Sequence, residues 1–180
     1  MRYFTFSGPI GSGKSSVSKL FASTAGAGWS GFGATVKEIA LERHLPISRE
    51  DLQVLGANLV EKECSSFCRR VIFKAREGQQ GASVIDGLRH IRVLKELRSI
   101  VGCDPLVCVY VDAPQPLRLE RVKARDGVSH EKLAELEKHS TEIEVNNRLK
   151  EVADFVANNG GSVEDCVASI VQWSRTLSPI

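Results

Sequence analysis

The sequence predicts an α/β fold in three layers, with a parallel sheet of about five strands and helices on both of its faces. Strand-like apolar stretches alternate along the chain with amphipathic, helix-like stretches, an order typical of parallel sheets. The stretches at 82–87 and 105–114 are apolar almost throughout, as expected of strands buried on both faces. At 180 residues the chain is expected to form one domain, spanning residues 1–180.

The first part of the chain alternates short elements. Residues 2–8 read as a strand and residues 14–23 as the helix that follows it. Residues 26–34 hold too many glycines for a helix, so they form either a second short strand or a loop. The spacing of apolar residues predicts another helix over 35–44.

Residues 46–77 read as helical almost throughout. Ser48 is placed as the N-cap, and Asp51 supplies an acid in the first turn. One straight helix of this length would span about 45 Å, which is long for a domain of this size. We therefore expect a break near Gly56 or Ser65.

The second half repeats the strand–helix order. Helices are predicted over 91–101 and 116–125, each directly after one of the apolar strands, and a last short strand at 153–160 precedes a helix over 162–177. The polar stretch from residue 126 to about residue 144 has few large apolar residues. Residues 125–147 are expected to form a small helical lid that excludes water.

Composition sets limits on the class of protein. Hydrophobic residues make up 42% and charged residues 26%, close to soluble averages, and no stretch is long enough to span a bilayer. The net charge of +2 is too mild to indicate a nucleic-acid scaffold. Five cysteines without metal-type spacing, and no secretory signal, lead us to expect a cytoplasmic protein that does not bind membranes.

The stretch GPIGSGKSS lies where the first strand gives way to the first helix. It fits the pattern G-x-x-x-x-G-K-[ST], in which backbone N–H groups and the amino end of a helix surround phosphate oxygens. The pattern predicts a P-loop NTPase fold that binds ATP, with the lysine on the terminal phosphates and the following serine on Mg²⁺. The residues expected to contact ATP here are Gly8, Pro9, Ile10, Gly11, Ser12, Gly13, Lys14, Ser15 and Ser16.

A carboxylate at the end of a neighbouring strand is expected to help Ser15 hold the metal. Asp86 follows a buried strand, at the sheet edge where parallel sheets bind ligands, and Asp112 competes for the same role. Asp86 is preferred. Whether it also orients the attacking oxygen as a base, or only organises the metal, stays open.

The stretch RLERVKARD places three arginines at helical spacings of three and four. Phosphoryl transfer needs positive charge around the moving group, so Arg121 and Arg125 are expected to be catalytic, with Arg121 beside the bound ATP. Arg118 is expected to be a solvated surface residue.

Together these motifs resemble the nucleoside monophosphate kinase branch of the P-loop proteins. That group includes adenylate-kinase-like enzymes, dephospho-CoA kinase and the phage-type deoxynucleoside monophosphate kinases. Four further stretches carry the resemblance: GFGATVKEIA, REDLQVLG, IDGLR and ADFVANNGG. The resemblance implies that the helical region 34–80 binds the acceptor.

The same resemblance assigns individual residues. It implies that Lys37 meets the acceptor phosphate, that Arg49 and Gln53 lie near the acceptor, and that Arg89 faces phosphate. It also implies that the donor adenine is contacted by the loop around Asn158 and Gly160.

The predicted function is transfer of the γ-phosphate of ATP to a small nucleotide acceptor, a (deoxy)nucleoside monophosphate, with Mg²⁺. One alternative is a kinase of a hydroxymethylated base within DNA. Others are a dephospho-CoA kinase-like enzyme, or a non-catalytic nucleotide switch. The stretch GWSGFGATVKE has no aspartate, which argues against the CoA precursor. The identity of the acceptor and the oligomeric state stay open.

Overall fold

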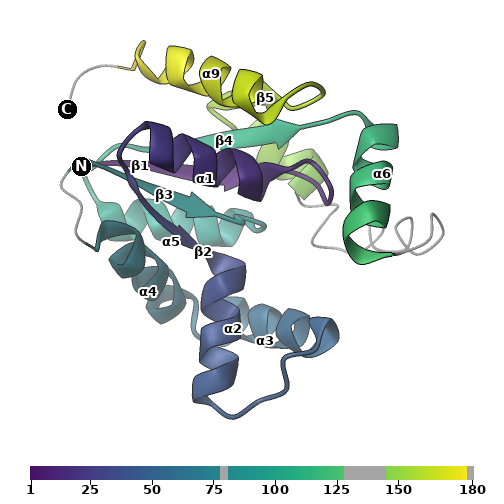
Figure 1. The fold of residues 1–180 in the computed structure, drawn as a ribbon. Coiled ribbons are helices and arrows are strands. Elements are labelled where there is room, and N and C mark those ends of the chain that lie inside the picture. Colours follow the sequence, from purple (N-terminus) through teal and green to yellow (C-terminus); the bar gives the residue numbers. More distant parts are fainter. Residues whose placement is uncertain (78–80, 128–144, 178–180) are drawn as a thin grey trace.

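The structure, a computed structural model, describes residues 1–77, 81–127 and 145–177 (Figure 1). Its centre is a five-stranded sheet in the order β2-β3-β1-β4-β5, and every neighbouring pair of strands is parallel. The predicted fold class is thereby confirmed. The strands are β1 (Arg2–Ser7), β2 (Gly28–Gly31), β3 (Ala82–Asp86), β4 (Leu106–Asp112) and β5 (Phe155–Asn158).

Helices cover both faces of this sheet. Figure 1 shows α1 (Lys14–Thr24) and α9 (Val163–Ser174) on one face, and α4 (Cys64–Arg76) with α5 (Ile91–Val101) on the other. Because successive side chains of a strand point to opposite faces, each strand of β1, β3 and β4 contributes to two separate cores. In β1, Phe4 packs against the α1 side, whereas Tyr3 is buried on the α4 side.

Two helices extend away from the sheet as an arm (Figure 1). The glycine-rich stretch forms β2, and α2 (Phe32–Glu42) follows it at once, three residues before the predicted start. The long helical stretch is broken, as predicted. Its first part, α3 (Arg49–Lys62), contains Gly56, and α4 begins after a break at Glu63, near the second predicted position.

The arm is tied to α4 by apolar and ionic contacts. The rings of Phe32 and Phe67 meet edge to face, with centroids 5.2 Å apart. Ion pairs join Lys74 to Glu38, and Arg43 to Glu63 at 2.8 Å. These contacts fix the arm beside the edge of the sheet where β1 and β3 end.

The remaining elements are α6 (Gln115–Asp126) and a short π-helix at Val145–Leu149. Of the predicted lid at 125–147, residues 128–144 lie outside the described residues. Within the described part of the chain, none of the helices has the length and apolar composition needed to cross a membrane.

Candidate active site

The glycine-rich loop connects the end of β1 to the start of α1 and needs glycine on steric grounds. Gly13 caps α1 with a φ of 82°, in the left-handed region. A Cβ atom there would lie 2.4 Å from the Nδ2 of Asn159, and one at Gly8 would lie 2.2 Å from the carbonyl oxygen of Val111. The loop is therefore pressed against the ends of β4 and β5, and its other side borders a cavity.

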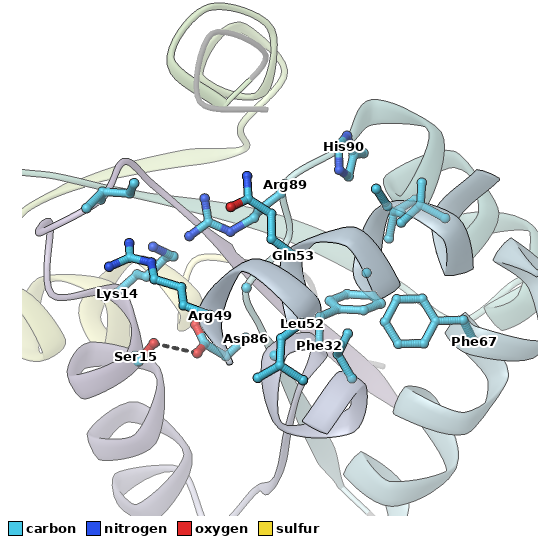
Figure 2. Close-up of a pocket in the computed structure, with 18 of the residues that line it drawn as sticks. Lys14, Ser15, Phe32, Arg49, Leu52, Gln53, Phe67, Asp86, Arg89 and His90 are labelled. Atoms are coloured by element: carbon cyan, nitrogen blue, oxygen red, sulfur yellow. Dashed lines mark hydrogen bonds between the residues drawn. The ribbon is translucent and has the colours of Figure 1, made fainter. Parts of the chain in front are cut away.

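Ser15 and Asp86 meet at the mouth of this cavity, where the Ser15 hydroxyl donates to Oδ2 of Asp86 at 2.7 Å (Figure 2). Asp86 is only 7% exposed, and its Oδ1 has no hydrogen-bond partner among the described residues. An unsatisfied buried oxygen of this kind costs about 1–3 kcal/mol, which a bound cation would offset. Two hard oxygen ligands, with the remainder left to water and phosphate, suit Mg²⁺. The residues present therefore fit the predicted metal.

Asp112 is occupied elsewhere. Its Oδ2 accepts a hydrogen bond from Lys150 at 2.7 Å, and its Oδ1 accepts one from the backbone of Ala113. Asp86, not Asp112, therefore lies next to Ser15. The described residues contain no cluster of three or more histidine, cysteine, aspartate or glutamate side chains able to hold a metal.

The cavity has a volume of about 460 Å³ and lies between the loop, the end of β3 and the arm. Four basic side chains line it: Lys14, Arg49, Arg89 and Arg125. Its walls are largely apolar, and they are contributed by Phe32, Val36, Leu52, Val60, Phe67 and Val93. Figure 2 shows Lys14 and Arg49 on the side where Ser15 and Asp86 meet, with the rings of Phe32 and Phe67 next to each other beyond them. The cavity thus combines a basic end with an aromatic end.

Half of the predicted site residues line the cavity: Ile10, Gly11, Lys14, Ser15, Arg49, Gln53, Asp86, Arg89 and Arg125. Lys37 does not. It is exposed on α2, because the buried positions of that helix occupy its other side. Asn158 and Gly160 also lie outside the cavity. They form a tight turn in which the Oδ1 of Asn158 accepts a hydrogen bond from the Gly160 N–H at 2.9 Å.

Arg121 lies behind the loop and not in the cavity. Its guanidinium donates to the carbonyl oxygens of Ser12 at 3.4 Å and Asn159 at 3.1 Å. The structure therefore places Arg121 next to the predicted ATP loop, with its hydrogen bonds directed to the backbone.

Two residues at this site were missed or misjudged from the sequence. The expectation that Arg118 is a surface residue is wrong, since it is only 9% exposed and donates to the Ile10 carbonyl at 3.1 Å. Asn159 is fully buried and donates to the Ser12 carbonyl at 2.7 Å. A usable signal was present in each case: Arg118 shares a helical face with Arg121, and Asn159 lies between two residues already singled out.

The geometry agrees with the comparisons to known proteins. A family model described as an AAA domain matches residues 5–145. The chain belongs to this AAA domain family. The family match covers the loop, Asp86 and the arm, whereas Asn158, Asn159 and Gly160 lie beyond its last residue.

Two relatives share this AAA domain sequence at moderate identity. The UPF0200/UPF0201 protein of Archaeoglobus fulgidus is 33% identical over 147 residues, which are 78% of this chain and 45% of the relative. The UPF0200 protein of Thermococcus onnurineus is 31% identical over 126 residues, 66% of this chain and 65% of the relative. The chain thus spans less than two thirds of either relative.

Among solved structures, the AAA domain is similar to a shikimate kinase from Bacteroides thetaiotaomicron. The TM-score is 0.61 at 13% sequence identity, over 96% of this chain and 98% of that chain. At this identity the likeness is one of fold. The resemblance to P-loop kinases is thereby confirmed for the fold, and the phage-type assignment stays a prediction.

Proposed function

We propose that the protein is a Mg²⁺-dependent kinase that transfers the γ-phosphate of ATP to a nucleoside monophosphate, deoxynucleotides included. The observation that carries the proposal is the cavity beside the Ser15–Asp86 pair, which joins four cations to an aromatic wall. The four cations suit the phosphates of donor and acceptor, and the aromatic wall suits a nucleotide base.

The donor side follows from the loop. Its N–H groups and Lys14 bind the polyphosphate, with the amino end of α1 adding a favourable dipole. Ser15 and Asp86 hold Mg²⁺, which when bound neutralises developing charge on the phosphate oxygens. Arg125, which lines the cavity, stabilises the negative charge of the phosphoryl group in transfer. Arg121 contributes its positive charge from behind the loop, where it is bonded to the Ser12 carbonyl.

The acceptor side favours a phosphate oxygen over an alcohol. A phosphate monoester is largely ionised at pH 7, because its second pKa is about 6, so no base is needed to activate it. Arg49 and Arg89 provide the charge that such an acceptor requires. An alcohol would need a proton acceptor, whereas in this proposal the Asp86 carboxylate, beside Ser15, is assigned to the metal.

The base has a suitable wall in the same cavity. Phe32 and Phe67 contribute aromatic carbon to its lining, and Gln53 supplies an amide that can donate to and accept from a base edge. A polyhydroxylated acceptor, such as the substrate named for the shikimate kinase neighbour, would leave its hydroxyls against apolar side chains.

A transfer assay tests the proposal. Labelled ATP is offered with each ribo- and deoxyribonucleoside monophosphate and with shikimate, in the presence of Mg²⁺ or EDTA. We expect Mg²⁺-dependent transfer to at least one monophosphate and none to shikimate. Silence on every monophosphate would reject the kinase assignment, and acceptor-independent hydrolysis of ATP would favour a nucleotide switch.

A further inference from the structure

We propose that Asn159 and Arg118 are positioning residues that hold two carbonyl groups of the glycine-rich loop away from the donor phosphates. The inference rests on the proposed binding of ATP at this loop and adds a cause for the loop's geometry. Neither residue lines the cavity, so both act through the backbone of the loop.

The first step is the pair of hydrogen bonds. The buried Nδ2 of Asn159 donates to the Ser12 carbonyl at 2.7 Å, and Nη1 of Arg118 donates to the Ile10 carbonyl at 3.1 Å. Arg121 donates a second, longer hydrogen bond to the Ser12 carbonyl at 3.4 Å, so Asn159 provides the shorter of its two bonds. The donors come from two different elements, the β5–α9 connection and α6. They therefore fix alternate peptide groups of the same loop from its outer side.

The second step is the geometry of the peptide bond. The described residues contain no cis peptide bond, and in a trans peptide the C=O of one residue and the N–H of the next point in opposite directions. Fixing the Ser12 carbonyl toward Asn159 therefore directs the Gly13 N–H away from Asn159. Fixing the Ile10 carbonyl toward Arg118 likewise directs the Gly11 N–H away from the Arg118 side chain. The loop's donors are thus oriented before any phosphate arrives.

The loop also packs closely against the residues that hold it. A Cβ at Gly13 would lie 2.4 Å from Nδ2 of Asn159, and one at Gly11 would lie 2.5 Å from the backbone oxygen of Arg118. Asn159 is itself held by its own backbone, whose N–H donates to the Asp112 carbonyl at 2.7 Å. Orienting donors in advance lowers the ordering cost of binding, so the loss should appear in phosphate affinity.

The test is the substitution Asn159→Asp, which keeps the size of the side chain and replaces the Nδ2 donor by an oxygen. At pH 8.5 the carboxylate cannot donate to the Ser12 carbonyl. We expect MgATP and inorganic tripolyphosphate to bind about tenfold more weakly, as measured by calorimetry. In the transfer assay, KM for ATP should rise and KM for the acceptor should stay unchanged.

Lowering the pH supplies a readout that a general loss of structure would not move. Because residue 159 is fully buried, burial should raise the pKa of a carboxyl group there, and a protonated carboxyl can donate as the amide did. The defect relative to the wild-type protein should therefore shrink at pH 5.5. The matched control is Asn147→Asp, the same change at an exposed position of the π-helix, which should bind tripolyphosphate like the wild type at both pH values.

If the Asn159→Asp protein does not fold, Arg118→Met tests the second bond, because methionine keeps the bulk of the side chain without a donor. Wild-type affinity for tripolyphosphate in a folded Asn159→Asp or Arg118→Met protein would overturn the inference. If the wild-type protein itself binds neither MgATP nor tripolyphosphate, the proposed donor site is wrong, and the positioning role falls with it.

Discussion

Ser15 and Asp86 lie 71 residues apart in sequence and meet at 2.7 Å because their strands are neighbours. β1 pairs with β3 so that Phe6 is level with Asp86, and the loop that follows β1 brings Ser15 back over the same edge. Burial of the Asp86 carboxylate makes its charge costly unless a cation is bound. This pair is therefore where we expect the proposed metal to bind.

Replacing Asp86 by asparagine removes the charge and keeps the size of the side chain. We expect the Asp86→Asn protein to fold and to lose about 100-fold in kcat, since a preorganised charge near the transferring group is lost. The measurement is the transfer assay over a Mg²⁺ titration. Asp112→Asn is the control and should retain near wild-type turnover, because Asp112 is paired with Lys150. The reverse result would move the metal to Asp112.

The sequence allowed prediction of those site residues whose signal is local. Lys14 and Ser15 follow from the glycine spacing, and Asp86 follows from its place at the end of a buried strand. Asn159 could not be assigned its partner in this manner, because its contact with Ser12 joins residues 147 positions apart. The Arg118 contact with Ile10 spans 108 positions. Such contacts depend on how helices and loops pack, which spacing alone does not specify.

At the scale of elements, the arm lines the part of the cavity that we propose for the acceptor. Ser48 caps α3, as predicted, and its hydroxyl accepts the Asp51 N–H at 3.2 Å. The cap fixes the first turn of α3, from which Arg49 reaches the cavity. The break between α3 and α4 was harder to place from the sequence, because neither Gly56 nor Ser65 is a proline, which would force a helix to end.

Removing the Arg49 guanidinium should weaken binding of the acceptor and leave binding of ATP unchanged. We expect Arg49→Ala to raise KM for the monophosphate about tenfold and to leave KM for ATP unchanged, since a hydrogen bond to a charged group contributes about 1.5–3 kcal/mol. Steady-state kinetics with each substrate varied in turn measures both constants. Lys62→Ala, at the other end of the same helix, is the control for loss of a positive charge. Equal increases in both KM values would place Arg49 outside the acceptor site.

At the scale of the whole molecule, the sheet order explains why the site lies where it does. The sequence predicted parallel strands and their number, but it could not predict that β3 inserts between β1 and β2. Spatial order depends on crossover connections, and here α2, α3 and α4 all lie between β2 and β3 in the chain. That long connection supplies half of the residues that line the cavity, so the fold places the proposed acceptor region beside Ser15 and Asp86.

The distribution of thiols over the molecule gives a test of this packing. Cys64, Cys68, Cys108 and Cys166 are buried, and Cys103 is exposed. Because the thiolate is the reactive form, and burial raises the pKa of Cys68, Cys108 and Cys166, the native protein should react slowly at these sites. We expect a disulfide reagent at pH 8 to modify Cys103 alone, and all five thiols after denaturation. Fast native modification of several thiols would contradict the buried core.

The same burial predicts how stability changes at alkaline pH. Burial raises the pKa of Cys108 from its ordinary value of 9.0 to about 11. Between these values the unfolded chain loses the thiol proton and the folded chain keeps it. The free energy of unfolding should therefore be fully supported by this group below pH 9 and should fall as the pH rises toward 11. Urea unfolding at intervals over this range measures the slope.

Cys108→Ala should be less stable at neutral pH, because it leaves a cavity, yet should lose stability less steeply with rising pH. An equally steep fall in the variant would show that Cys108 does not hold its proton in the folded protein.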